Sequence, residues 1–423
     1  MLYVIRSSWP LLLGMLLLMV GNGLQGTLLG VRGDIEGFST FWMSVIMSAY
    51  FLGFLGGSQM APDLIRRVGH IRTFAALGSV ISAVLILYPA IADPIAWTLL
   101  RVVIGFCFSA VYVTAESWLN NSASNETRGQ ALSLYMIVQM SGLVAAQGLL
   151  VLGDPSGYIL FVVLSVLVSL SFAPILLSVT PTPAFETTAP MSFVEVFHLS
   201  PLGCIGIFAM GAVYSALFGM SAVYGTQSDL SLAEISLFVG AIYVGGLLFQ
   251  FPIGWISDRM DRRVLIAVVS AIGTVAAISA IYSGSFYLLL IAAFAVGAMA
   301  NPLYALLLAH TNDFLEPDQM AAAGGRLLFI NGVGAVTGPL IVGALMGWFG
   351  PQGFFLYLAV LMAGLATYAG FRMTRRPSTA TEDTISYAPV LASASAVAVE
   401  VAQEVFAEAT QDELDEASLP PSA

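Results

Sequence analysis

Twelve long apolar stretches constrain what this chain of 423 residues can fold into. A helix that crosses a lipid bilayer needs about 20 mostly apolar residues. Stretches of about that length cover residues 11–29, 42–61, 73–92, 95–119, 130–152, 158–179, 202–224, 233–256, 264–282, 286–309, 327–349 and 353–371. Because backbone polar groups cannot stay unpaired in lipid, each stretch must form a helix. The sequence therefore predicts an all-α membrane protein with twelve transmembrane helices.

The charged residues agree with this class of protein. They make up only 9% of the chain, whereas a soluble domain carries about 25%. The formal net charge of −11 arises mostly beyond Arg376, where the chain holds nine acids and no base. The rest of the chain is close to neutral, so its charge gives no indication of a nucleic-acid partner.

The chain divides into two similar halves. Six predicted helices precede and six follow residues 180–201, a Pro- and Thr-rich linker that we expect to be extended. Arginine-containing loops follow the second and the eighth helix, at equivalent places in the halves. This duplication predicts two pseudo-symmetric six-helix lobes, residues 1–179 and 202–376, with a substrate site at their interface. Residues 377–423 form an acidic tail that we expect to be disordered.

The arginines also predict the topology. The chain has no lysine, and its loop arginines gather on one face of the predicted membrane domain. Arg32 is the only arginine in a loop of the opposite face. By the positive-inside rule, the linker and both termini are expected on the cytoplasmic side.

The densest charge cluster is GWISDRMDRR, residues 254–263, between the eighth and ninth predicted helices. Its acids and arginines can pair with helix ends or with opposite charges nearby. Pairs that form in only one conformation can hold a transporter closed on that side. Alternatively, the arginines only orient the chain in the membrane. The predicted gating residues of this half are Gly254, Asp258, Arg259, Arg262 and Arg263.

The equivalent loop of the first half reads PDLIRRVGHIR, residues 62–72. Arg66, Arg67 and Gly69 are the predicted gating residues here. If a latch forms, an arginine must seek an acid on another helix, and Glu116 near the end of the fourth predicted helix is the candidate. Arg128 in the next loop would join this group. Alternatively, these residues only cap helix ends.

Arg101 lies six residues inside the fourth predicted helix. An arginine at this depth costs several kcal/mol unless it faces water or a partner. Three interpretations stay open: a ligand for an anionic substrate, a partner in a proton relay, or a side chain that extends to the lipid headgroups.

Neutral polar residues interrupt several other predicted helices. Such residues are costly in lipid, so they should face the interior of the bundle. They either line a substrate cavity or only join helices. Together with Arg101, the candidates for the cavity are Asn22, Gln25, Gln139, Tyr214, Gln250, Asn301, Tyr304 and Asn331.

These strings resemble the major facilitator superfamily of transporters. Residues 254–263 match its pattern G-x-x-x-D-R-x-[GD]-R-R, and Glu116 followed by Arg128-Gly129 resembles an E…RG element of its sugar-type members. In the first half, Arg66 stands where the superfamily keeps an aspartate and Pro62 where it keeps a glycine. GNGLQGTLLG, LIRRVGHIR, AESWLN and GGLLFQFPIGWISDRMDRR more narrowly resemble the YcaD-type branch, and the resemblance covers residues 1 to about 376.

The resemblance implies alternating access, a central cavity lined by the first, fourth, seventh and tenth helices, and a bacterial inner membrane as the location. The resemblance does not identify a substrate. We therefore expect a secondary active transporter of a small organic solute. A non-transporting sensor or scaffold of the same fold, docking through the acidic tail, is the alternative. Within transport, efflux of amphipathic compounds and uptake of an anion both stay open.

The expected partners are a small-molecule substrate and the lipid bilayer, with a coupling ion such as H+ left open. No acid lies near the middle of a predicted helix, which argues against proton coupling through a buried carboxylate there. The chain has no Walker A string, and its two cysteines lack metal-binding spacing. We therefore expect a monomer that is not an enzyme and that has no cofactor or metal.

Overall fold

The computed structural model of the protein describes residues 2–122, 125–176, 191–315, 317–375, 387, 389–395, 397–399 and 402. Within these ranges the chain forms fourteen helices and no strand. Twelve of the helices are long and apolar enough to cross a membrane. The prediction of an all-α membrane protein with twelve spans is confirmed.

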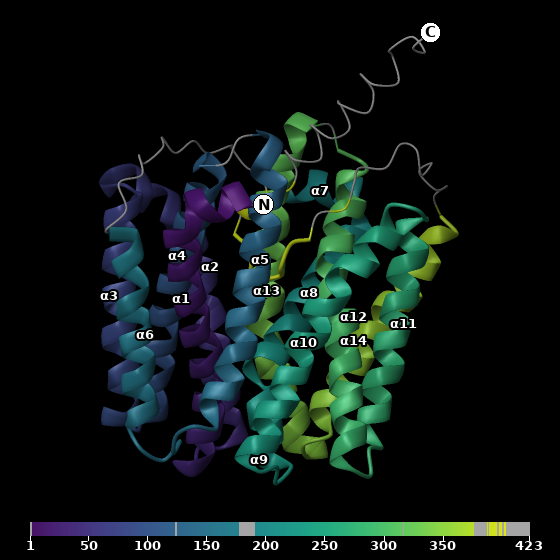
Figure 1. Cartoon of the computed structure of the whole chain (residues 1–423). Helices are drawn as coiled ribbons and strands as arrows, with labels where there is room; N and C mark the ends of the chain where they lie inside the picture. The colour runs from purple at the N-terminus through teal and green to yellow at the C-terminus, as the bar shows by residue number, and fades with distance from the viewer. Residues whose placement is uncertain are drawn as a thin grey trace.

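Each half of the chain contributes six of the spanning helices (Figure 1). The first six are α1 (Leu2–Ile35), α2 (Thr40–Val68), α3 (His70–Ala90), α4 (Pro94–Ser122), α5 (Asn125–Leu150) and α6 (Ile159–Leu176). The other six are α8 (Pro201–Gly219), α10 (Leu232–Ser257), α11 (Arg262–Ile281), α12 (Phe286–Asn312), α13 (Pro317–Phe349) and α14 (Gly353–Met373). Two short helices, α7 (Phe193–Leu199) and α9 (Ser221–Gln227), flank α8. Of the predicted linker, residues 180–190 lie outside the described part of the chain.

The spanning helices run between two faces of the bundle. We call the face that carries Gly69 and Asp258 the latch face, and the opposite one, which carries Arg32 and α9, the Arg32 face. The N-terminal end of α1 lies toward the latch face, at the top of Figure 1. At that face Gly69 joins α2 to α3 with φ +84°, a backbone conformation that glycine adopts without strain.

Glycines let helices cross at close range at matching places in the two lobes. In each lobe, one glycine of each crossing helix faces the backbone of the other helix. A Cβ atom at any of these positions would come within 2.2 Å of a backbone oxygen, so a larger residue would force the helices apart. The first-lobe pair, on α2 and α4, is Gly53 and Gly105, and the second-lobe pair, on α10 and α12, is Gly245 and Gly297.

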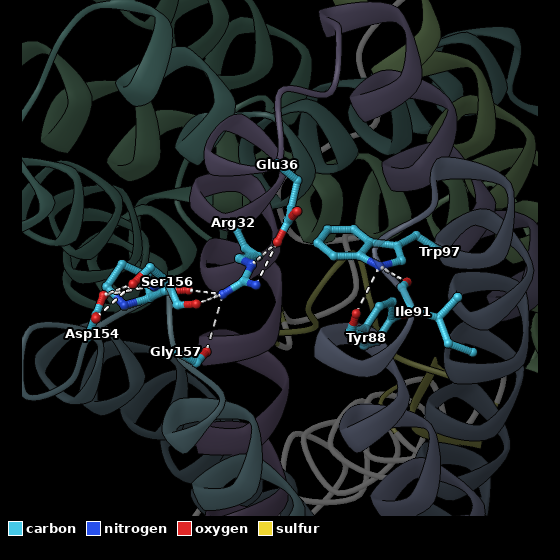
Figure 2. A network of polar contacts seen from close by, with 9 residues as sticks. Arg32, Glu36, Tyr88, Ile91, Trp97, Asp154, Ser156 and Gly157 are labelled. Carbon is cyan, nitrogen blue, oxygen red and sulfur yellow. Dashed lines mark hydrogen bonds and ion pairs between the residues drawn. The ribbon is translucent and has the colours of Figure 1, made fainter.

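Arg32 fastens the end of α1 to the loop between α5 and α6 (Figure 2). Its guanidinium pairs with Glu36 at 2.6 Å and donates to the backbone oxygens of Ser156 and its two neighbours. In that loop the hydroxyl and amide of Ser156 hydrogen-bond Asp154 and hold the pKa of its carboxyl below the usual value. All these contacts lie within the first lobe.

The two lobes meet directly on the Arg32 side. Gln227 of α9 donates to the Thr40 hydroxyl, and Ser236 of α10 donates to the Gln147 carbonyl of α5. Gly30 of α1 lies against Ala222 of α9. The lobes are therefore closed against each other on this side.

On the latch side, part of the C-terminal tail lies between the lobes. We call the described residues 387, 389–395, 397–399 and 402 the tail segment; it is the yellow trace near α5 and α13 in Figure 1. Leu391, Ser395 and Ala402 are at most 4% exposed. The prediction of a disordered tail is wrong for these residues. Their small and apolar side chains are buried between the lobes, and polar groups of the helices pair with their backbone.

Candidate functional site

A cavity lies between the lobes at the inner end of the tail segment. The space between its atoms amounts to about 480 Å³, part of which is open to solvent. None of its fourteen lining residues is charged. They are Asn22, Tyr50, Phe51, Phe54, Leu55, Ser58, Tyr112, Tyr214, Leu328, Asn331, Gly332, Ala335, Ala392 and Ser393.

A hydrogen-bonded group on one wall fixes the amide of Asn22. Asn22 Nδ2 donates to the Tyr112 hydroxyl at 2.7 Å, and Asn22 Oδ1 accepts from Gln25 Nε2 at 3.1 Å. The Tyr50 hydroxyl also donates to Asn22 Oδ1, at 3.4 Å. Three helices, α1, α2 and α4, therefore position one carboxamide at the cavity.

Aromatic rings from both lobes form another part of the wall. Tyr214 stacks on Phe218 within α8, with ring centroids 5.8 Å apart and an interplanar angle of 15°. Tyr50 of α2 lies 5.7 Å from the same Phe218 ring. Flat apolar faces beside amides and phenols suit a solute that is polar at its edge and apolar on its face.

The structure brings together three of the nine predicted cavity residues: Asn22, Tyr214 and Asn331. Gln25 supports Asn22, as described above. Gln250 lines a second hollow nearer the latch face, together with Leu391. Three further candidates are buried and line neither of these hollows: Arg101, Gln139 and Tyr304. Asn301 also lines neither hollow and faces the α10 backbone at Gly246.

The resemblance implied a cavity lined by the first, fourth, seventh and tenth spans. In the structure α1, α4 and α8 each contribute, but α12, the tenth span, contributes none of the lining residues. Most of them come from α2 and α13, because these two helices pack against each other at the lobe interface.

Sequence reasoning missed the contribution of α2. Tyr50, Phe54 and Ser58 recur every four residues, so they share one helix face. In α13, Leu328 lies three residues before Asn331 and Ala335 four residues after it, so these residues also share one helix face. The sequence shows this periodicity, but aromatic and small residues at helical spacing also occur where helices pack, so the pattern does not distinguish a cavity wall from a helix contact.

Arg101 lies wholly inside the first lobe and is 0% exposed. Its guanidinium carbon lies 4.9 Å from the centre of the Tyr50 ring, and Nη2 donates to the Met47 sulfur at 3.0 Å. One turn earlier, Trp97 donates to the backbone oxygens of Tyr88 and Ile91 and closes the adjacent turn (Figure 2). In this conformation the interpretation of Arg101 as an extended surface side chain is excluded, because neighbouring helices enclose it.

The second-lobe latch cluster is centred on Arg262. This side chain is 1% exposed and pairs with Asp313 at the end of α12, which is 3% exposed. Arg262 also reaches Asp258 at 3.4 Å. Arg263 pairs with Asp261 at 2.7 Å. Partial burial raises the pKa of the Asp261 carboxyl, but the hydrogen bonds and the charge of Arg263 lower this pKa by more, so that it lies below the usual value. These contacts join α10, α11 and α12 within the second lobe.

Two predicted gating residues, Gly254 and Asp258, face the tail segment. Asp258 Oδ1 accepts the backbone N–H of Tyr387 at 2.7 Å, and the Tyr387 ring occupies the space beside Gly254. Burial raises the pKa of the Tyr387 hydroxyl. Arg259, by contrast, contacts its own helix: it donates to the Trp255 carbonyl and lies 4.0 Å from the Trp255 ring centre.

The predicted first-lobe group does not assemble in this structure. Arg66 is exposed and pairs with Asp63, and Arg67 is exposed beside it. Glu116 is buried and accepts from the Tyr135 hydroxyl at 3.1 Å and from the Ser395 amide at 3.0 Å. The expected pairing of Glu116 with an arginine of this loop is wrong for this conformation, because Glu116 faces the interior while Arg66 faces outward. Arg128 is half-buried in the first turn of α5.

Twelve spanning helices in two lobes around an interior cavity are the architecture of a secondary transporter. The sequence profile described as Major Facilitator Superfamily matches residues 11–240 and 203–397. The chain belongs to the major facilitator superfamily and is a multi-pass membrane transporter of a small molecule.

Curated relatives support the same family. The "Uncharacterized MFS-type transporter YcaD" of Escherichia coli O45:K1 (strain S88 / ExPEC) is 27% identical over 362 residues, which cover 84% of this chain and 92% of the relative. The protein of the same description from Escherichia coli (strain SMS-3-5 / SECEC) matches with the same identity and coverage. The predicted resemblance to the YcaD-type branch is confirmed.

Solved structures share the fold at low sequence identity. A mutant of the nucleoside transporter NupG has a TM-score of 0.74 at 15% identity, over 86% of this chain and 99% of the other. A bacterial homologue of the human lysosomal transporter Spinster, inward-facing and unoccupied, has a TM-score of 0.68 at 15% identity, over 96% and 98%. The E. coli fucose:proton symporter FucP has a TM-score of 0.58 at 16% identity, over 87% and 99%.

Proposed function

We propose that the cavity at Asn22 is the substrate site and that it takes a small, uncharged polar solute with a flat or ring-shaped body. The observation that carries this proposal is the lining itself, which combines two carboxamides, three phenols and two phenylalanine rings without a charged group. A charged solute would lose its hydration in such a site without gaining a counter-charge. NupG and FucP, which share the fold, are named for nucleosides and for fucose, which are solutes of this kind.

A thermal-shift panel on the purified protein tests this substrate class. Ligands that bind the folded state raise its melting temperature. We expect nucleosides or neutral sugars to raise it, and organic anions and cationic amphipaths to leave it unchanged. Uptake of the positive compounds into proteoliposomes would then establish transport. A panel in which only anions raise the melting temperature would reject the proposal.

We also propose that the latch face is cytoplasmic and that the protein resides in a bacterial inner membrane. Arg66, Arg67, Arg262 and Arg263 all lie at or near that face, whereas Arg32 lies at the opposite one. This asymmetry is the one the positive-inside rule describes. Labelling of single cysteines in intact cells with an impermeant maleimide tests the orientation: Ser228→Cys near the Arg32 face should react, and Thr374→Cys should not.

Proton coupling is supported by Glu116. It is a carboxylic acid on a spanning helix and is only 3% exposed. Ionisable residues inside a membrane are costly and commonly serve proton or ion movement. If Glu116 carries the proton, Glu116→Gln should abolish accumulation driven by a pH gradient and leave solute exchange intact. Unchanged accumulation in this variant would exclude that role.

A further inference from the structure

We propose that the cleft on the latch side is a peptide-binding site whose ligand is the tail segment of this chain, so that the tail acts as a tethered plug of the transport route. This inference rests on the proposed function in one respect, namely that the cleft is the route of the solute. The tail segment contacts both lobes, and it forms part of the wall of the cavity itself.

The first contact fixes the segment to the second lobe at the latch face. The backbone N–H of Tyr387 donates to Asp258 at 2.7 Å, and Gln250 Nε2 donates to the Tyr387 hydroxyl at 3.0 Å. A Cβ atom on Gly254 would lie 2.3 Å from the Tyr387 ring. The glycine of the latch motif therefore makes the space for this ring.

The segment turns at its deepest point, between the lobes. The Ala394 amide donates to the Leu391 carbonyl at 2.9 Å, which closes a turn. Asn331 Nδ2 of α13 donates to the Ala392 carbonyl at 2.7 Å. Leu391 itself enters the hollow between Met140 of α5 and residues of α10. The Ala392 carbonyl thus occupies the Asn331 amide, a hydrogen-bond donor of the cavity wall that would otherwise face the solute.

The last contacts fix the segment to the first lobe. The Ser395 amide donates to Glu116 Oε2 at 3.0 Å, so the buried acid of α4 receives a backbone donor. Beyond it, Val399 and Ala402 are 1% and 0% exposed. The segment therefore joins Asp258 of one lobe to Glu116 of the other.

The chemistry of these contacts is that of peptide recognition. Two carboxylates accept backbone N–H groups, and one carboxamide donates to a backbone carbonyl. The side chains at the deepest point are those of alanine and serine, so little space is needed beyond the backbone. The site fits an extended peptide with small residues.

Two consequences follow for transport. The lobes cannot close on the latch side while the segment lies between them, and a solute in the cavity must compete with it. Eleven residues separate Arg375, at the end of the described second lobe, from Tyr387, and a chain of that length spans at most about 40 Å. A short tether keeps its ligand at an effective concentration on the order of millimolar. A segment that is bound ten times more often than free would lower the apparent affinity for a solute about tenfold.

Cysteine accessibility tests occupancy of the cleft without requiring a known solute. Ser58→Cys lines the cavity and is a conservative change; it is placed in a chain whose Cys107 and Cys204 are replaced by serine, and the purified protein is treated with a water-soluble maleimide. We expect slow labelling in the full chain. Labelling should become at least about tenfold faster in a chain that ends at Arg376, by the same population argument. Thr374→Cys, at an exposed position, should label equally in both backgrounds.

A second variant keeps the test decisive if the shortened chain does not fold. Leu391→Asp places a charge in the apolar hollow without altering either lobe, and Leu391→Met keeps the hollow filled. We expect fast labelling of the cysteine at position 58 with Leu391→Asp and slow labelling with Leu391→Met. A synthetic peptide of residues 387–402, added at millimolar concentration to the shortened or Leu391→Asp protein, should restore slow labelling.

The outcomes separate this inference from the proposed function. Equal labelling of the cysteine at position 58 in the full, shortened and Leu391→Asp chains would overturn the plug, whatever the substrate panel shows. Fast labelling only in the variants would establish it even if no uncharged solute binds. Peptide that fails to protect the shortened chain would overturn the assignment of the cleft as a peptide site.

Discussion

Asn22 of α1 donates a hydrogen bond to the Tyr112 hydroxyl of α4 at 2.7 Å, although 90 residues separate them in the chain. The pair lies at the cavity, where the amide is also held by Gln25 and Tyr50. A side chain fixed in this way offers a solute a preorganised polar group, which lowers the entropy cost of binding.

The first prediction concerns this pair. Asn22→Ala should weaken binding of an uncharged solute about fivefold, because the loss of one good hydrogen bond costs about 1 kcal/mol. Isothermal titration with a solute found in the thermal-shift panel measures it. Gln139→Ala is the matched control, since Gln139 is equally buried but does not line the cavity. Equal weakening in both variants would mean a general loss of packing instead.

The second prediction concerns the buried cation at Arg101. Because no acid pairs with its guanidinium among the described residues, its burial opposes the conformation seen here. Arg101→Met should stabilise the form closed on the Arg32 side by about 1–4 kcal/mol, the range seen when apolar groups replace buried ionic ones. The melting temperature should rise and labelling of Ser48→Cys, beneath the closed side, should slow. Arg259→Met, at an exposed arginine, should do neither; a lower melting temperature in Arg101→Met would contradict the prediction.

The third prediction concerns the pair of Arg262 and Asp313. Asp313→Ala should destabilise the protein by about 3–5 kcal/mol, because it leaves a buried arginine charge without this acid. Asp63→Ala removes the acid from an exposed pair with Arg66 and should cost at most about 1 kcal/mol. Thermal unfolding of both variants in one detergent gives the comparison. Equal costs would show that burial does not decide the strength of these pairs.

The fourth prediction concerns the close crossing of α2 and α4. Gly53→Ala would place a methyl group 1.9 Å from the Val102 carbonyl oxygen, so the helices must separate. We expect a cost of about 1–3 kcal/mol, as for other overpacked interiors. Gly56→Ala, one turn away, meets nothing closer than 3.9 Å and should be neutral or slightly stabilising. Thermal unfolding checks both, and a stable Gly53→Ala protein would exclude the close crossing.

Much of the fold followed from the sequence because lipid leaves a chain few choices. The length of the apolar stretches predicted the twelve helices. Polar residues within those helices predicted that Asn22, Tyr214 and Asn331 line the cavity. The contribution of Tyr50 and Phe54 did not follow, because aromatic residues serve packing and binding alike. The partner of Glu116 did not follow either, since the Ser395 amide carries no sequence signal and the acidic composition of the tail favoured disorder.

The contacts of Arg32 also bear on how the two sides respond to dissolved salt. Arg32 is held by Glu36 and by the loop of its own lobe, so the described contacts that join the lobes on that side are uncharged, such as Gln227 to Thr40. On the latch side, the carboxyl groups of Asp258 and Glu116 accept backbone N–H groups of the tail segment. Mobile ions screen charges beyond about 8 Å at physiological ionic strength, and more closely as the salt concentration rises. The Asp258 and Glu116 bonds are 3.0 Å or shorter and Glu116 is buried, so mobile ions act much less on them than on exposed charges. Neither closure on the Arg32 side nor retention of the tail should therefore change strongly with ionic strength, so the transporter should keep the same balance of conformations in dilute and in concentrated salt.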